Sequence, residues 1–227
     1  MSWVPLESNP EVMNKYLENL GVPTKWQMMD VYGLDADLLA TVPRPVLALL
    51  LLFPINDGYT QFCKEQDAEI KSKGQTVSDK IFYVKQKISN ACGTMALIHS
   101  VANNTDQITL GDGALKKFIE ESAGMDAVGR GDLLLKADAI ANIHKELALT
   151  GQSEAPDATQ PVNFHFVALV HVDGGLYELD GSKSFPINHG DTTPETFLED
   201  AAVVCRKYME RDPENVNFTI VALAANN

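Results

Sequence analysis

The stretch QKISNACGTMALIHS, residues 86–100, is the part of the chain around which the rest is organised. Its second half, about residues 91–101, has the apolar spacing of a helix, and Ser89 and Asn90 before it are residue types that favour a helix N-cap. Cys92 is therefore predicted to lie in the first helical turn. Unpaired backbone N–H groups and the helix dipole lower the pKa of a thiol at that place, so the sequence predicts a nucleophilic thiolate.

The same stretch leaves two interpretations of Cys92 open. The run IFYV at residues 81–84 is typical of a short strand, and Gln86 follows it where its amide could face whatever Cys92 attacks. Free cysteines are, however, among the most buried residues, and taken alone Cys92 is more simply explained as a core residue. The rest of the chain has to decide between them.

The composition is that of a globular protein from a reducing compartment. The 227 residues are 45% hydrophobic and 22% charged, which suits one domain with a sizeable core, and no run of 18 apolar residues is present that could cross a membrane. The first residues, MSWVPLESNPE, lack the basic and apolar regions of a signal peptide, and the three cysteines show no zinc-site spacing. We therefore expect a cytoplasmic protein.

A strong negative charge limits the kind of partner. The chain has 18 Lys and Arg against 31 Asp and Glu, a formal net charge of −13. This argues against a nucleic-acid partner, because phosphates need a basic surface. It favours a basic protein or peptide, although solubility explains the same charge equally well.

Helical and strand patterns are interleaved along what we interpret as a single domain, residues 1–227. Helices are predicted at about 10–20, 59–73, 91–101, 114–122, 131–149 and 197–208, and strands at 26–32, 46–53, 163–172, 176–180, 184–189 and 216–224. The turn residues 173–175, DGG, make at least part of the sheet antiparallel. The longest loop, residues 149–161, is either an active-site lid or a plain connector. The mixture predicts an α+β fold in which helices cover a sheet.

The hairpin around this turn can supply what a cysteine hydrolase needs, a base and an acid that orients it. If its turn has two residues, His165 and Asp180 share one face of the strands, on a diagonal within reach of a hydrogen bond. A three-residue turn would reverse the parity. His171 and Glu178 also share a face, but they lie nearer the turn, where a solvated ion pair is the ordinary outcome, so His165 is favoured.

The other histidines and cysteines are assigned no chemistry. His99 lies about 10.5 Å along the helix from the thiol, too far for a hydrogen bond, and is interpreted as a core or rim residue. His144 lies on a polar helix without an obvious acid partner, and His189 in a turn where it bonds locally. Cys63 lies among acidic residues and is interpreted as structural or surface-exposed, and Cys205 faces the core.

Taken together, these segments resemble the ubiquitin C-terminal hydrolase family of cysteine proteases, most of all its small cytosolic members that consist of the catalytic domain alone. The resemblance rests on Gln86, NACGT at 90–94 and HFVALVHVDGGLYELDG at 165–181. It extends over essentially the whole chain through WVPLESNPEVMNKYL at 3–17, VPRPV at 42–46, APD at 155–157 and FPINHG at 185–190.

The resemblance implies a fold and four catalytic roles. Cys92 would be the nucleophile, His165 the general base and acid, Asp180 the residue that orients His165, and Gln86, with the backbone N–H of Cys92, the oxyanion hole. The implied fold is papain-like α+β, with a central, mainly antiparallel sheet flanked by helices and a knotted backbone. Residues 144–162 resemble the active-site crossover loop that limits the size of the leaving group. No metal or cofactor is needed.

The implied activity is removal of small adducts or short extensions from the C-terminal glycine of ubiquitin, through an acyl-enzyme and by a monomer. The acidic surface then has a use, because the C-terminal tail of ubiquitin carries arginines. The residues expected to contact ubiquitin are Pro5, Leu6, Glu7, Glu11, Asp30, Val162 and Phe164. Two alternatives remain open: a protein that mainly binds and stabilises free ubiquitin, and a hydrolase that prefers a ubiquitin-like modifier such as NEDD8.

Overall fold

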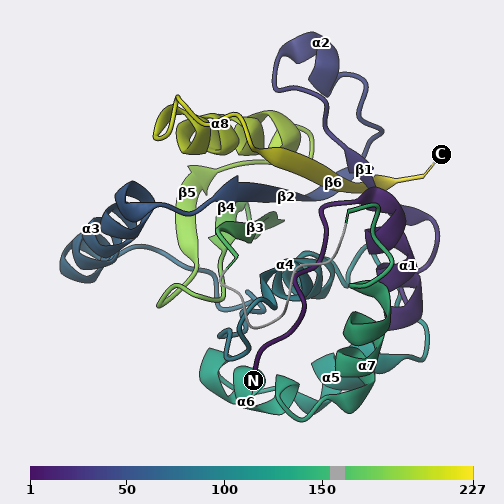
Figure 1. Cartoon of the computed structure of the whole chain (residues 1–227). Coiled ribbons are helices and arrows are strands. Elements are labelled where there is room, and N and C mark those ends of the chain that lie inside the picture. The colour runs from purple at the N-terminus through teal and green to yellow at the C-terminus, as the bar shows by residue number, and fades with distance from the viewer. Residues whose placement is uncertain (154–161, 227) are drawn as a thin grey trace.

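The computed structural model describes residues 1–153 and 162–226. Within them the strands form one six-stranded sheet in the order β1-β6-β2-β3-β4-β5, and every pair of neighbours is antiparallel (Figure 1). The strands are β1 (Trp26–Asp30), β2 (Val46–Pro54), β3 (Phe164–Val172), β4 (Gly175–Leu179), β5 (Ile187–Asp191) and β6 (Thr219–Ala225). The predicted α+β class is confirmed.

Helices cover both faces of the sheet. They are α1 (Pro10–Leu20), α2 (Ala36–Leu39), α3 (Asp57–Lys73), α4 (Cys92–Ala102), α5 (Ala114–Glu121), α6 (Ala127–Leu134), α7 (Asp138–Leu147) and α8 (Phe197–Glu210). The core on one face includes residues of α2 and α8, and the core on the other includes residues of α1, α4, α5, α6 and α7. Figure 1 shows α8 above the sheet, α4 to α7 below it, and α3 reaching out to one side.

The central strands are apolar on both faces, and this apolar composition puts them in the middle of the sheet. In β2, Leu50 packs into the core that contains α4, whereas Leu49 and Leu51 pack into the core that contains α8. A strand buried on both sides has no polar face to turn toward water, so its sequence is continuously hydrophobic rather than alternating. The predicted central strand at 46–53 is confirmed.

The predicted strand at 81–84 is wrong, because other groups replace its strand partner. The backbone of Phe82 exchanges two hydrogen bonds with the side-chain amide of Asn103, at 2.8 and 2.9 Å. The N–H of Val84 donates to Nε2 of His99 at 3.0 Å. Side chains of α4 and the residue that follows it thus satisfy the backbone that a neighbouring strand would otherwise pair.

The predicted cap of α4 is also wrong. The N-cap position is Ala91, with no side-chain cap, and Asn90 adopts a left-handed conformation with φ of 62° that turns the chain into the helix. Asparagine tolerates this conformation better than most residues. The first N–H groups of α4 are therefore not satisfied by a capping side chain, and they point toward the side where Cys92 lies.

The helix predicted at 131–149 is two helices, α6 and α7, and residues 135–137 separate them. A Cβ at Gly131 would lie 2.3 Å from the carbonyl oxygen of Lys85, so the absence of a side chain lets α6 pack against the segment before Gln86. Because α7 runs on to Leu147, the predicted loop at 144–162 begins later, and its residues 154–161 lie outside the described part of the chain. The knot depends on the path of that loop and stays a prediction.

In the described part of the chain, no helix is both long and apolar enough to span a bilayer.

Candidate active site

Helix α4 carries Cys92 at its first position and is buried along the rest of its length. It packs on β3 and β2, and the next residue, Gly93, lies against the N-terminal segment. A Cβ at Gly93 would lie 2.9 Å from Cβ of Leu6 and 3.4 Å from Cδ2 of Phe166. Glycine is needed there because the N-terminal segment crosses directly over the start of the helix.

The β3–β4 hairpin has the two-residue turn that the parity argument needs. Val172 pairs with Gly175, and the turn residues Asp173 and Gly174 have φ of 49° and 79°, as in a type I′ turn. The strand pairing ends at Ala168 and Leu179. His165 precedes Ala168 on β3 and Asp180 follows Leu179, so both residues lie at the open end of the hairpin.

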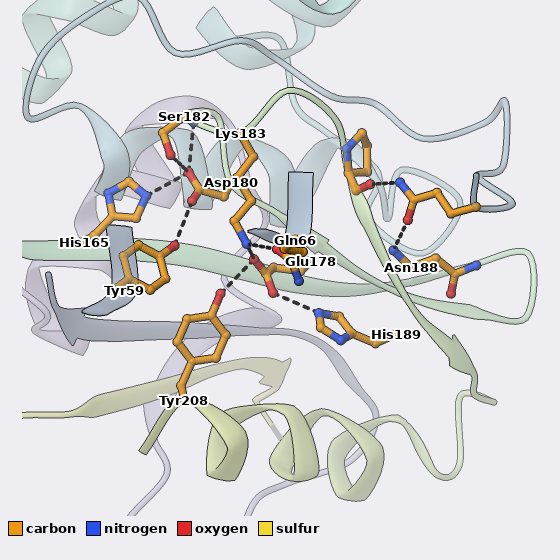
Figure 2. Close-up of polar contacts among 12 residues, drawn as sticks. Tyr59, Gln66, His165, Glu178, Asp180, Ser182, Lys183, Asn188, His189 and Tyr208 are labelled. Atoms are coloured by element: carbon orange, nitrogen blue, oxygen red, sulfur yellow. Dashed lines mark hydrogen bonds and ion pairs between the residues drawn. The ribbon is translucent and has the colours of Figure 1, made fainter. Parts of the chain in front are cut away.

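His165 and Asp180 meet at that end of the hairpin. Nε2 of His165 donates to Oδ1 of Asp180 at 2.8 Å, and the two residues are 8% and 1% exposed. Asp180 Oδ1 also accepts from Ser182, from its N–H at 2.9 Å and from its Oγ at 2.7 Å, while the Tyr59 hydroxyl lies 3.4 Å from Oδ2 (Figure 2). Burial opposes ionisation of Asp180, but the charge and hydrogen bond of His165 outweigh burial and lower the pKa of the carboxyl.

The thiol of Cys92 is the second partner of the His165 ring. Burial would raise the pKa of Cys92, yet its hydrogen bond to His165 and the charge of that ring lower it. Burial would lower the pKa of His165, but Asp180 and Cys92 raise it well above its ordinary value. The opposite shifts favour a resting thiolate–imidazolium pair, with Nε2 held by Asp180 and the other ring nitrogen left for the thiol.

Gln86 lies beside this row and is fixed by its backbone. Its N–H donates to the carbonyl of Gly181 at 2.9 Å, and a Cβ at Gly181 would lie 2.9 Å from Cβ of Gln86. The side-chain Nε2 donates one of its two hydrogens to the carbonyl of Ile88 at 2.9 Å, and Oε1 is buried with no partner among the described residues. The second hydrogen of Nε2 is therefore left for another acceptor.

A cleft of about 170 Å³ opens above the thiol. Its lining is mostly apolar and includes five of the seven predicted contact residues together with Cys92: Pro5, Leu6, Glu7, Val162 and Phe164. The carboxylate of Glu7 is already engaged, since Oε2 accepts from the N–H of Ser153 at 3.1 Å and from its Oγ at 2.9 Å. The other two predicted contacts lie elsewhere: Glu11 pairs with Lys15 on α1, and Asp30 is exposed at the end of β1.

His171 and Glu178, the alternative pair on the hairpin, do not bond to each other. Nε2 of His171 accepts from the N–H of Gly174 at 3.2 Å, so its ring caps the turn. Glu178 is 1% exposed and bonds instead to Lys183, His189 and Tyr208. The parity was correct, but the expectation of a solvated ion pair was wrong, because Glu178 faces the core below α8 rather than water.

Two further histidines are buried and uncharged. His99 is a core residue, as predicted, whereas His144, assigned to a polar helix, is 1% exposed. Its Nε2 donates to the carbonyl of Val4 at 2.7 Å, so Nδ1 is left to accept from the Thr94 hydroxyl, whose oxygen lies 2.8 Å away and 2.8 Å from that of Tyr16. This network, which has no local signal in the sequence, ties α7 and the N-terminal segment to α4 two residues beyond Cys92.

We expect these two histidines to make the protein sensitive to acid. Burial lowers the pKa of each to about 4, below the value of about 6.5 in an unfolded chain. Between these values the unfolded chain binds more protons, so stability falls as the pH falls, by about 2 kcal/mol per histidine between pH 7 and pH 5. Urea unfolding at both pH values measures the loss.

The comparison variant is His144→Gln, which cannot titrate. It should be less stable than the parent chain at pH 7, because a buried hydrogen-bond partner is lost, yet it should lose about 2 kcal/mol less on acidification. His165, whose pKa is raised, changes stability in the opposite sense over this range, and it contributes equally to both proteins. If the parent chain and His144→Gln lost the same free energy of unfolding between pH 7 and pH 5, buried His144 would not be a cause of the acid sensitivity.

Within residues 1–153 and 162–226, no cluster of three or more His, Cys, Asp and Glu side chains is arranged to hold a metal ion. The chemistry that these residues can support is that of a thiol, an imidazole and a carboxylate in one hydrogen-bonded row, on an antiparallel sheet flanked by helices. That arrangement is typical of a cysteine-type peptidase.

Comparisons with known proteins narrow this class to one family. The family model described as ubiquitin carboxyl-terminal hydrolase, family 1, matches residues 3–210, and the chain belongs to this family. A ubiquitin carboxyl-terminal hydrolase of Drosophila melanogaster is 47% identical over 99% of this chain and 98% of its own. The human ubiquitin carboxyl-terminal hydrolase isozyme L1 is 46% identical over 98% of each chain.

A solved structure shows the same fold. The catalytic domain of Trichinella spiralis UCH37, bound to ubiquitin vinyl methyl ester, has a TM-score of 0.78 over 100% of this chain and 97% of its own, at 22% identity. The fold and family implied by the sequence are thus confirmed. The roles of single residues rest on the geometry described above.

Proposed function

We propose that the chain removes groups from the C-terminal glycine of ubiquitin, with Cys92 as nucleophile, His165 as general base and acid, and Asp180 as the residue that orients His165. The observation that carries the assignment is the buried row in which His165 bonds to Asp180 on one side and to Cys92 on the other. Ubiquitin as substrate is supported by the family and by the ubiquitin derivative bound to the Trichinella spiralis domain.

The proposed reaction has two steps that return each group to its starting state. The Cys92 thiolate attacks the carbonyl carbon of the terminal glycine, and the negative oxygen is held by Nε2 of Gln86 and the backbone N–H of Cys92. The His165 imidazolium then gives its proton to the leaving amine as the carbon–nitrogen bond breaks. In the second step His165 takes a proton from water, which attacks the thioester and releases the thiolate.

The cleft supports the assignment of the contact residues. Its apolar wall of Pro5, Leu6, Val162 and Phe164 suits an extended chain whose terminal glycine reaches Cys92, and Phe164, 40% exposed, lies at the rim. We propose that Glu7 acts on ubiquitin indirectly, through its bonds to Ser153. For Glu11 and Asp30, both exposed outside the cleft, we keep the proposal of an outer contact with ubiquitin.

We further propose that the chain works as a single domain and as a monomer in the cytoplasm, in the ubiquitin pathway, with the crossover loop limiting the leaving group. Three free cysteines support a reducing compartment, because Cys92 must remain a thiol. The net charge of −13 supports a basic tail as the bound peptide.

Labelling with ubiquitin vinyl methyl ester tests the function. A hydrolase should bind one molecule of the probe covalently per chain. It should also release a fluorescent amine from the C-terminus of ubiquitin. Tight binding of free ubiquitin without labelling would favour the alternative, a protein that stabilises ubiquitin. The same substrate made with NEDD8 decides between the two modifiers through the ratio of kcat/KM values.

Gln86→Ala should lower kcat by roughly 10²- to 10³-fold and leave KM nearly unchanged. Of the two hydrogens on Nε2, one bonds to the carbonyl of Ile88, and the proposed partner of the other is the substrate oxygen that becomes negative only during the reaction. Steady-state kinetics on the ubiquitin substrate measure both constants. Gln61→Ala, which removes an exposed amide bonded to Glu65 on α3, is the control and should leave both constants unchanged. An unchanged kcat in Gln86→Ala would mean that the backbone alone forms the oxyanion hole.

A further inference from the structure

A second buried carboxylate lies two residues before Asp180 and takes no part in the proposed reaction. Glu178 accepts from Nζ of Lys183 at 2.5 Å, from Nε2 of His189 at 2.8 Å and from the hydroxyl of Tyr208 at 2.8 Å (Figure 2). The Lys183 side chain is 8% exposed and also donates to Gln66 at 2.9 Å. The cluster therefore joins β4, β5, α8 and α3 at one point.

The same lysine closes the turn that carries Asp180. Its backbone N–H donates to the carbonyl of Asp180 at 2.9 Å, so residues 180–183 form a turn whose far end is pulled toward Glu178. A second tether comes from Tyr83, whose hydroxyl lies 2.5 Å from the carbonyl oxygen of Asp180 and 2.8 Å from that of Lys183. Ser182, inside this turn, holds Oδ1 of Asp180.

Stability alone does not explain a charged pair at this place. Removing a carboxylate and an ammonium from water costs several kcal/mol for each, and apolar residues of similar volume often stabilise a core equally well or better. The pair offers something that an apolar contact lacks, a fixed distance and direction between strand β4 and the turn. The atom placed by that constraint is the carboxylate oxygen that accepts the hydrogen bond from Nε2 of His165.

We propose that Lys183 and Glu178 form a positioning pair, which together with Tyr83 fixes the turn at residues 180–183 and thereby aims the Asp180 carboxylate at His165. The inference rests on the proposed function of Asp180 and His165. None of the three residues touches the reacting atoms. Loosening the turn should leave ubiquitin binding intact and weaken the hold on the imidazolium, so the chemical step should slow while KM stays the same.

The test compares a variant pair that removes both charges with one that removes a single hydroxyl. Glu178→Gln/Lys183→Met leaves no unpaired buried charge, and its amide keeps an acceptor for Tyr208 and a donor for His189. Tyr83→Phe removes only the second tether. Lys80→Met is the matched control, since Lys80 pairs with Asp173 at 2.6 Å on the surface at the other end of the hairpin. Urea unfolding and circular dichroism give the folded fraction of each.

Two readouts separate positioning from folding. Normalised to folded protein, kcat on the ubiquitin substrate should fall roughly 10- to 100-fold in the first two variants, with KM within about 2-fold of the parent. The rate at which iodoacetamide alkylates Cys92 is measured as a function of pH by mass spectrometry of the Cys92 peptide. In the first two variants this pH profile should lose its plateau at acid pH, and the midpoint of the profile should rise by roughly one pH unit. The control should match the parent in both.

The outcomes decide the proposal. Folded variants with the parent's kcat and alkylation profile would overturn it and leave the pair a purely structural contact. If the paired variant does not fold, Tyr83→Phe decides alone, and Lys183→Arg, which keeps the charge, should retain most of kcat. If the parent itself failed to turn over ubiquitin, the proposed function would fall, whereas the alkylation profiles would still show whether Lys183, Glu178 and Tyr83 control the state of Cys92.

Discussion

Cys92→Ala should abolish hydrolysis of the ubiquitin substrate, with a loss of at least about 10⁴-fold in kcat, and should also abolish labelling by ubiquitin vinyl methyl ester. The reason is that neither His165 nor Asp180 can form the acyl bond. When catalytic residues act as one unit, removing one of them abolishes nearly all of the activity. Binding of free ubiquitin, measured by calorimetry, should persist, because the variant removes one sulfur atom from the floor of the cleft.

Cys63→Ala is the matched control for this prediction. Cys63 is a free, partly buried cysteine on α3, outside the row formed by Cys92, His165 and Asp180. Its removal should leave kcat and labelling within about 2-fold of the parent. If labelling persisted in Cys92→Ala and disappeared in Cys63→Ala, the nucleophile would have been assigned to the wrong thiol.

His165→Ala should be nearly as damaging, with a loss of at least about 10³-fold in kcat. The variant removes both the proton donor for the leaving amine and the partner that lowers the pKa of Cys92. Alkylation of Cys92 by iodoacetamide should then require a higher pH than in the parent, since burial is left as the dominant influence on the thiol. Alkylation reactions quenched at set times between pH 5 and pH 9 measure this change in the pH dependence.

His171→Ala is the control from the same strand. His171 accepts a hydrogen bond from the N–H of Gly174 at the hairpin turn, at the opposite end of β3 from His165. It should keep kcat within about 2-fold, with at most a modest loss of stability. If His171→Ala were inactive and His165→Ala active, His171 rather than His165 would be the general base.

The pairing of His165 with Asp180 was predictable because it depends on local rules, whereas the place of Cys92 beside them followed only from the family resemblance. A type I′ turn at Asp173 and Gly174 fixes the register of β3 and β4, and the register decides which side chains share a face. Only the choice of His165 over His171 needed more than parity, and depth in the strand supplied it. Central strands such as β2 were predictable for a similar reason, since apolar residues on both faces leave one position in a sheet.

The parts that sequence reasoning missed depend on partners far along the chain. Whether Glu178 meets water or a core is decided by Tyr208 on α8, 30 residues away, and by His189 on β5. From the sequence alone His144 looks like a surface residue, because its partners, the Thr94 hydroxyl and the carbonyl of Val4, lie far away along the chain. A cluster of Lys, Glu, Tyr and His spread over three segments has no local pattern from which it can be predicted.

The strand order has a consequence for how the chain reaches its native state. Strand β6 lies between β1 and β2, and it pairs residues near position 225 with residues near position 26. Until β6 inserts, β1 and β2 each present an unpaired edge, and such edges are where folding intermediates join one another. Contacts of this sequence separation raise the contact order and slow the search. Refolding should therefore be most prone to aggregation before this single insertion, and a chaperone that shields strand edges should raise the yield.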